Sequence, residues 1–168
     1  MQSAIEGGPA GIGPAGTGIA LQRRFRASPH RVFRAWTEPA ALREWWCPAG
    51  WIAGEIVIDL RPGGTYRIEM RRIGGGECLA IRGEFLDVTP PRRLVFTWIW
   101  DGAFADTAPT LVTVEIDGSP DETLLTLRHE NFADPGTRNQ HHTGWIAACN
   151  RLDRVVTPIG EPYRRLAD

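Results

Sequence analysis

Lysine is absent from this chain, and its absence excludes several kinds of catalytic site. The 19 residues counted as Lys or Arg are all arginine. A lysine Schiff base, a lysine-containing phosphate-binding loop and a kinase-type lysine are therefore excluded. Serine is scarce, and no G-x-S-x-G, H-E-x-x-H, C-x-x-C or dinucleotide-binding motif occurs. The common sequence signatures of hydrolases, zinc proteases and redox enzymes are thus missing.

Long apolar runs and a strong charge imbalance are also lacking. No stretch approaches the roughly 20 apolar residues that span a bilayer, so we expect no membrane insertion. The formal net charge is -1, so no strong positive field exists to attract nucleic acid. The first residues lack a basic start followed by an apolar core, so no secretory signal is predicted. We expect a cytoplasmic protein.

Cysteine and histidine are few and poorly placed for metal binding. Cys47, Cys78 and Cys149 lie far apart, which favours free thiols in a reducing compartment over disulfides or a zinc knuckle. His141 and His142 are adjacent, and adjacent helical side chains point about 100° apart. The sequence therefore predicts no metal site and no cofactor.

The chain length suits a single domain with short tails. The sequence has 168 residues, of which 42% are hydrophobic and 23% charged, as in ordinary globular proteins. Residues 1–17 are rich in Gly, Ala and Pro and predict a disordered tail. Residues 18–157 form the predicted domain, and 158–168 a C-terminal tail.

Periodicity along residues 18–157 predicts both strands and helices. Apolar and polar residues alternate over 19–26 and in several short segments between 55 and 129, which indicates an antiparallel meander. Ser28-Pro29 and Pro39 are typical helix starts, and each predicts a short helix. Asp134-Pro135 begins a long helix that continues to about Val156.

This order of elements predicts an α+β, helix-grip fold. A curved antiparallel sheet of about six to seven strands wraps around the long C-terminal helix, and two short helices follow the first strand. Only the last helix is long enough to cover the apolar face of the sheet. The curvature leaves a gap between sheet and helix, which is the natural place for a ligand.

Several segments, in order, resemble one known family. They are Ser28-Pro29-His30-Arg31-Val32-Phe33-Arg34-Ala35-Trp36-Thr37, Trp45-Trp46-Cys47-Pro48, Asp59-Leu60-Arg61-Pro62-Gly63-Gly64, Gly83 with Phe85, and Gly144-Trp145 with Leu152. Together they resemble the SRPBCC (START-like) superfamily, in the branch named after the activator of the heat-shock-protein-90 ATPase. The resemblance covers residues 18–157 and implies the helix-grip fold, a hydrophobic cavity and a link to the stress response. It implies no shared catalytic residues.

Aromatic residues supply the candidate site, since the chain has seven tryptophans. We predict a pocket for a small hydrophobic or aromatic molecule. Its predicted walls are Tyr66, Met70, Trp98, Trp100, His129 and Trp145, with Phe33, Trp36 and Trp45 near the entrance. In this interpretation, Trp98→Ala or Trp145→Ala weakens the binding of an apolar probe while the fold persists.

Two alternatives use the same fold. One is an enzyme of the cyclase, dehydratase or hydrolase type, with His129 or Tyr66 in acid–base chemistry. The other is a co-chaperone-like module that stimulates a heat-shock protein ATPase through an exposed apolar patch. A homodimer through a sheet edge also stays open.

Overall fold

Seven antiparallel strands form one curved sheet in the order β1-β7-β6-β5-β4-β3-β2. The computed structural model describes residues 18–102 and 108–158. The tail predicted at 1–17 lies outside the described residues, as does all but the first residue of the tail at 158–168. The strands are β1 (Ile19–Phe25), β2 (Trp51–Ile58), β3 (Thr65–Arg72), β4 (Cys78–Thr89), β5 (Arg93–Asp101), β6 (Thr110–Gly118) and β7 (Thr123–Glu130).

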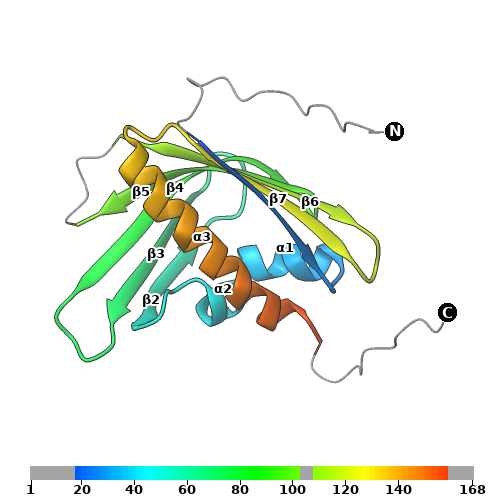
Figure 1. The fold of residues 1–168 in the computed structure, drawn as a ribbon, viewed down its shortest axis with the longest axis horizontal. Helices are drawn as coiled ribbons and strands as arrows, with labels where there is room; N and C mark the ends of the chain where they lie inside the picture. Colours follow the sequence, from blue (N-terminus) through cyan, green and yellow to red (C-terminus); the bar gives the residue numbers. More distant parts are fainter. Residues whose placement is uncertain (1–17, 103–107, 159–168) are drawn as a thin grey trace, which may run out of the picture.

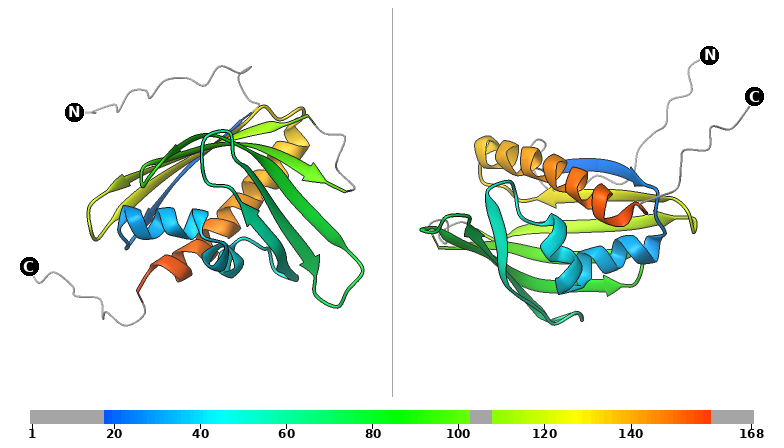
Figure 2. Two further views of the ribbon diagram at one scale, coloured as in Figure 1. Left: turned by 180° about the vertical axis from the view of Figure 1, so that it is seen from behind. Right: turned by 90° about the horizontal axis from the view of Figure 1, so that it is seen from below.

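Three helices cover the concave face of this sheet (Figures 1 and 2). They are α1 (Pro29–Thr37), α2 (Pro39–Trp45) and α3 (Pro135–Val156). The α+β architecture predicted from the sequence is confirmed, including the two short helices after the first strand and the long C-terminal helix. Figure 2 shows the curvature of the sheet, with all three helices on its concave side.

Strand alternation determines which side chains reach the helices. In β7, buried residues alternate with half-buried ones, and Leu125, Leu127 and His129 are completely buried. Successive side chains of a strand point to opposite faces, so these three share the covered face. β7 is hydrogen-bonded between β1 and β6, and His129 lies near its C-terminal end, opposite Ile19 of β1.

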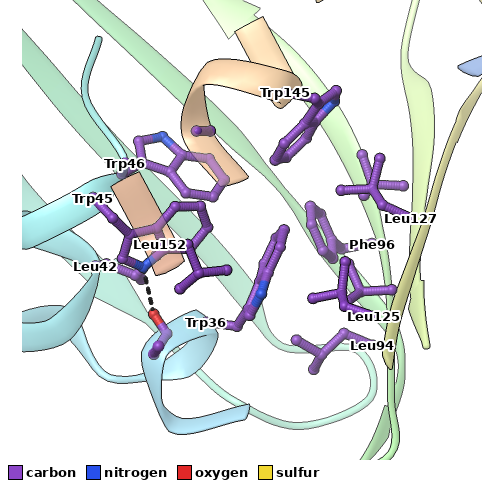
Figure 3. Close-up of a cluster of buried hydrophobic side chains, with 14 of the residues drawn as sticks. Trp36, Leu42, Trp45, Trp46, Leu94, Phe96, Leu125, Leu127, Trp145 and Leu152 are labelled. Atoms are coloured by element: carbon purple, nitrogen blue, oxygen red, sulfur yellow. Dashed lines mark hydrogen bonds between the residues drawn. The ribbon is translucent and has the colours of Figure 1, made fainter. Parts of the chain in front are cut away.

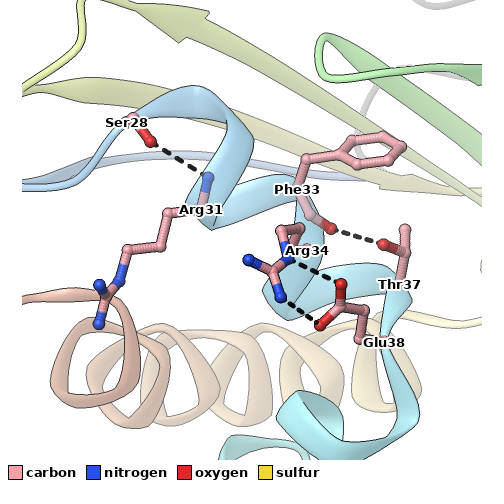
Figure 4. Close-up of polar contacts among 6 residues, drawn as sticks. All are labelled: Ser28, Arg31, Phe33, Arg34, Thr37 and Glu38. Carbon is pink, nitrogen blue, oxygen red and sulfur yellow. Dashed lines mark hydrogen bonds and ion pairs between the residues drawn. The ribbon is translucent and has the colours of Figure 1, made fainter.

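Local hydrogen bonds fix the ends of α1 (Figure 4). The Ser28 hydroxyl accepts a hydrogen bond from the Arg31 backbone N–H at 3.3 Å, which caps the helix start. At the other end, Arg34 and Glu38 form an ion pair at 2.7 Å, and the Thr37 hydroxyl donates to the Phe33 carbonyl at 2.9 Å. These two contacts fix the turn between α1 and α2. The exposed ion pair contributes little to stability by itself.

The part of the hydrophobic core drawn in Figure 3 lies between α1, α2, α3 and strands β5 to β7. Trp45 is 1% exposed, and its indole N–H donates to the Ala35 carbonyl at 2.9 Å. Leu152 of α3 is completely buried in the same cluster, together with Leu94 and Leu127 of the sheet. Side chains therefore fill this half of the space beneath the sheet.

Candidate functional site

A pocket of about 350 Å³ lies between α3 and strands β3 to β6. It occupies the part of the concave face that α1 does not fill. The lining residues are Trp46, Pro48, Met70, Ile81, Trp98, Trp100, Ala108, Thr110, Phe132, Ala133, Asp134, Thr137, Gln140, His141, Gly144, Trp145, Ala148 and Arg151.

One face of α3 forms a wall of the pocket along most of the length of the helix. The lining residues Thr137, His141, Gly144, Ala148 and Arg151 follow one another at intervals of three or four positions. This spacing keeps side chains on one face of a helix. The stripe rises about 21 Å from first to last, at about 1.5 Å per residue. The pocket is therefore long rather than round.

The start of α3 is fixed where this stripe begins. Asp134 precedes the helix, and its carboxylate accepts hydrogen bonds from the Thr137 backbone N–H at 2.8 Å and the Thr137 hydroxyl at 2.7 Å. These bonds hold the pKa of Asp134 below its usual value. Both carboxylate oxygens are occupied, so the main role of Asp134 in the structure is to cap the helix.

Four of the nine predicted site residues line this pocket: Met70, Trp98, Trp100 and Trp145. Trp98 and Trp145 are 7% and 4% exposed, and their ring centroids lie 5.4 Å apart in an edge-to-face arrangement. Such pairs form rigid, planar apolar walls. The structure brings these four side chains together, and binding of a ligand by them stays a prediction.

The other five predicted residues, Phe33, Trp36, Trp45, Tyr66 and His129, do not line this pocket. Phe33, Trp36 and Trp45 belong to the filled core and do not form an entrance. The periodicity that placed them inward was correct, but α1 and α2 pack against the sheet without leaving room for a guest.

Tyr66 packs against the backbone of the sheet. Its hydroxyl donates to the Thr97 carbonyl at 2.7 Å, and its ring lies over Gly83, where an added Cβ would come within 2.8 Å of Tyr66 Cε1. Burial raises the pKa of the phenol. With Trp36, Tyr66 borders a separate void of about 20 Å³, which offers little more room than a single water needs.

His129 is completely buried beside the pocket, and both of its ring nitrogens are hydrogen-bonded. The Trp145 indole N–H lies 3.0 Å from Nδ1, and Thr110 Oγ1 lies 2.7 Å from Nε2. An indole N–H only donates, so Nδ1 accepts and Nε2 carries the hydrogen that is donated to Thr110. Burial, with the neighbouring His141, lowers the pKa of His129 to about 2. His129 is therefore a neutral link between α3, β6 and β7.

His141 makes a second link of the same kind between α3 and β5. Its Nε2 accepts from the Trp100 indole N–H at 3.0 Å, and its Nδ1 donates to the Thr137 carbonyl at 2.8 Å. Burial lowers the pKa of His141 as well. The His129 and His141 ring centroids lie 5.3 Å apart. Through their hydrogen bonds, these two neutral histidines hold Trp145 and Trp100 in place.

Trp98 is the exception among the pocket tryptophans. Its indole nitrogen is buried and has no hydrogen-bond partner within the described ranges. Buried N–H groups without an acceptor are uncommon and costly. Trp36, which does not line the pocket, has a buried indole nitrogen of the same kind.

Arg151 lies at the end of the pocket nearest α2. Its Nε donates to the Trp45 carbonyl at 2.8 Å and its Nη2 lies 3.5 Å from the Trp46 carbonyl. These carbonyls end α2, where a cation is favoured. The positive charge thus borders a pocket whose walls are mainly apolar.

The polar lining residues Thr137, Gln140, His141 and Arg151 were not among the sequence-based candidates. The sequence indicates them only through their positions, because they share a helical stripe with Ala148 and lie beside Trp145.

In the described part of the chain, no group of three or more His, Cys, Asp and Glu side chains could hold a metal ion. None of the helices within residues 18–102 and 108–158 is long and apolar enough to cross a membrane.

The arched sheet, the long covering helix and the pocket between them define a helix-grip protein of the SRPBCC class. Residues 26–157 match the family described as Activator of Hsp90 ATPase homolog 1-like protein. The chain belongs to this family, as the sequence motifs predicted.

Solved structures of bacterial proteins share this fold. A Chromobacterium violaceum protein is 27% identical, with a TM-score of 0.76, over 84% of this chain and 99% of that one. A Rhodobacter sphaeroides protein is also 27% identical, with a TM-score of 0.73, over 90% and 100% of the two chains. An AHSA1 protein from Silicibacter pomeroyi, 24% identical with a TM-score of 0.72 over 82% and 95%, shares the fold. A comparison with curated proteins finds no significant match.

Proposed function

We propose that this protein binds a small apolar or aromatic molecule in the pocket beneath α3, in the cytoplasm. The observation that carries the proposal is a pocket of about 350 Å³ walled by four indole rings, since ligand pockets typically measure about 300–1,000 Å³. Burial of apolar ligand surface supplies about 25 cal/mol per Å² before the costs of association. The three cysteines, all free, are compatible with a reducing compartment.

Binding is favoured over catalysis because the two predicted acid–base residues are occupied. The lone pair of His129 accepts the Trp145 N–H, and the Tyr66 hydroxyl donates to a backbone carbonyl. Neither borders the pocket. A general base must reach the proton that it removes, and His129 reaches only Trp145 and Thr110.

Gly144 offers the sharpest test, because a side chain there would enter the pocket. An added Cβ meets no atom within 4 Å, and Gly144 lies on the lining face of α3. We expect Gly144→Leu to weaken the binding of the neutral fluorescent probe N-phenyl-1-naphthylamine at least tenfold. Thr143→Leu, at an exposed neighbour that does not line the pocket, is the matched control and should bind like the wild type. Equal affinity of Gly144→Leu and wild type would reject the proposal.

Gly144→Ala should stabilise the protein. Alanine is favoured over glycine inside a helix by roughly 1 kcal/mol, and the open space means that the new methyl group causes no clash. We expect urea unfolding to show a gain of about 0.5–1 kcal/mol. A loss of stability would mean that the backbone at this position needs a glycine.

A chaperone-docking role is the second candidate, and exposed apolar side chains at one edge of the sheet favour it. Ile52 and Val57 of the edge strand β2 are 54% and 52% exposed, and Ile73, in the turn after β3, is 61% exposed. The family description refers to activators of the Hsp90 ATPase. A stimulated ATPase rate with added wild type, lost in Ile52→Asp/Val57→Asp, would support this role, and an unchanged rate would reject it.

A further inference from the structure

The positive charge of Arg151 has no carboxylate partner in the structure. None of the ion pairs within residues 18–102 and 108–158 involves Arg151. The titratable groups nearest to it are the thiols of Cys47 and Cys149, whose pKa values are raised by burial, and another cation, Arg154. Burial lowers the pKa of the guanidinium, as expected for a cation that is partly withdrawn from water.

The geometry of the guanidinium leaves one binding edge free. Its contacts with the Trp45 and Trp46 carbonyls use Nε and Nη2, which form one side of the planar group. A guanidinium has five N–H donors, so the edge made by Nη1 and the outer hydrogen of Nη2 has donors to spare. This pair of donors matches the two oxygens of a carboxylate.

The rest of the pocket is suited to an uncharged body. Between Arg151 and Thr137 the walls are mainly indole rings, Met70 and Ile81. The other charged side chain of the lining, Asp134, lies beyond the opposite end of the stripe, and Thr137 occupies both of its oxygens. A second anionic group on the ligand would therefore find no cation at that end.

We propose that the ligand is an elongated monocarboxylic acid, whose carboxylate binds the free edge of Arg151 and whose apolar body extends along α3 towards His141. This inference rests on the proposed function and specifies the ligand class. A single guanidinium edge pairs well with one carboxylate, whereas a phosphate dianion would leave charge uncompensated beside apolar walls.

Matched probes of equal chain length test the carboxylate directly. At pH 8, wild-type protein should bind decanoate at least tenfold more tightly than 1-decanol, measured by titration calorimetry. Decanedioate should bind at least tenfold more weakly than decanoate, since its second carboxylate would be buried among indoles.

Variants of Arg151 then assign the preference to one side chain. In Arg151→Gln, the preference for decanoate over 1-decanol should disappear, because the variant has no positive charge to pair with the carboxylate. Arg151→Lys keeps the positive charge and should retain part of the preference. It serves as the test variant if Arg151→Gln folds poorly. Arg154→Gln, at an exposed arginine on the same helix, is the control and should keep the full preference.

The outcomes separate this inference from the proposed function. Equal affinity for decanoate and 1-decanol in the wild type, or an unchanged preference in Arg151→Gln, would overturn the carboxylate assignment and leave the apolar pocket standing. Failure of the wild type to bind either these probes or N-phenyl-1-naphthylamine would contradict the proposed function itself.

Discussion

Replacing Trp145 by alanine is expected to reduce the free energy of unfolding by about 3–5 kcal/mol, which is typical for removal of a buried tryptophan. Trp145 is 4% exposed and stacks on Trp36 at 5.8 Å between ring centroids. It also contacts Trp46 and Trp98, so its loss opens a cavity at the centre of the aromatic cluster. The Nδ1 atom of His129 would lose its hydrogen-bond donor as well, which adds a desolvation cost.

This loss is large because small domains have a total stability of only about 5–15 kcal/mol. Trp145→Phe should lose less than Trp145→Ala, because it keeps most of the ring volume but removes the N–H. Trp51→Ala is the control, since Trp51 is half-exposed and lies under the Arg72 guanidinium at 5.0 Å from the ring centroid. Urea unfolding followed by circular dichroism measures all three. A Trp145→Ala protein within 1 kcal/mol of wild type would contradict this account of the core.

The position of Trp145 limits one test that the sequence suggested. Trp145→Ala is predicted to weaken the binding of an apolar probe while the fold persists, but Trp145 belongs to the core and to the pocket wall at the same time. A loss of binding in that variant would not separate the two roles. A substitution at Gly144, where an added Cβ meets no atom within 4 Å, separates them.

The free energy of unfolding should fall by about 2 kcal/mol between pH 7 and pH 5 because of His129 alone. Its pKa is about 2 in the folded protein and about 6.5 in the unfolded chain. Between these values the unfolded chain binds more protons, so stability is full above pH 6.5 and decreases as the pH falls. His141, with a pKa that is also lowered, acts in the same direction.

The titration of Asp134 and Glu38 contributes little to the change in stability between pH 7 and pH 5. Hydrogen bonds lower the pKa of Asp134 and that of Glu38, so their contribution is lost only below the usual carboxylate values of 3.8 and 4.5. His129→Gln keeps one donor and one acceptor but cannot titrate, and it should lose the share of the pH dependence that belongs to His129. Wild-type protein with the same free energy of unfolding at pH 5 and pH 7 would show that His129 is not held neutral.

The order and type of the secondary-structure elements could be predicted from the sequence because each has a local signal. Alternation marked the strands, and Asp134-Pro135 marked the start of α3, where Asp134 indeed caps the helix. The motifs identified the family, which the match over residues 26–157 confirms.

The site was predictable only in part. Periodicity separates side chains that point inward from those that point outward, but it does not tell whether an inward side chain fills the core or lines a cavity. Trp36 and Trp98 both have inward patterns and both belong to the core cluster, yet only Trp98 also lines the pocket. Alternation likewise placed His129 inward, but the pairing of its nitrogen with Trp145 depends on how α3 crosses the sheet. Arg151 was overlooked because a lone arginine on a helix usually faces solvent.

The most direct test of a ligand pocket beneath α3 is a nitrogen-15 NMR titration that follows the tryptophan indole N–H signals while decanoate is added. The signals of Trp98, Trp100 and Trp145 should shift together and saturate, because their rings line the pocket. The signal of Trp51, which does not line it, should stay in place. Stationary signals for Trp98, Trp100 and Trp145 at millimolar decanoate, or a shift confined to Trp51, would contradict the account.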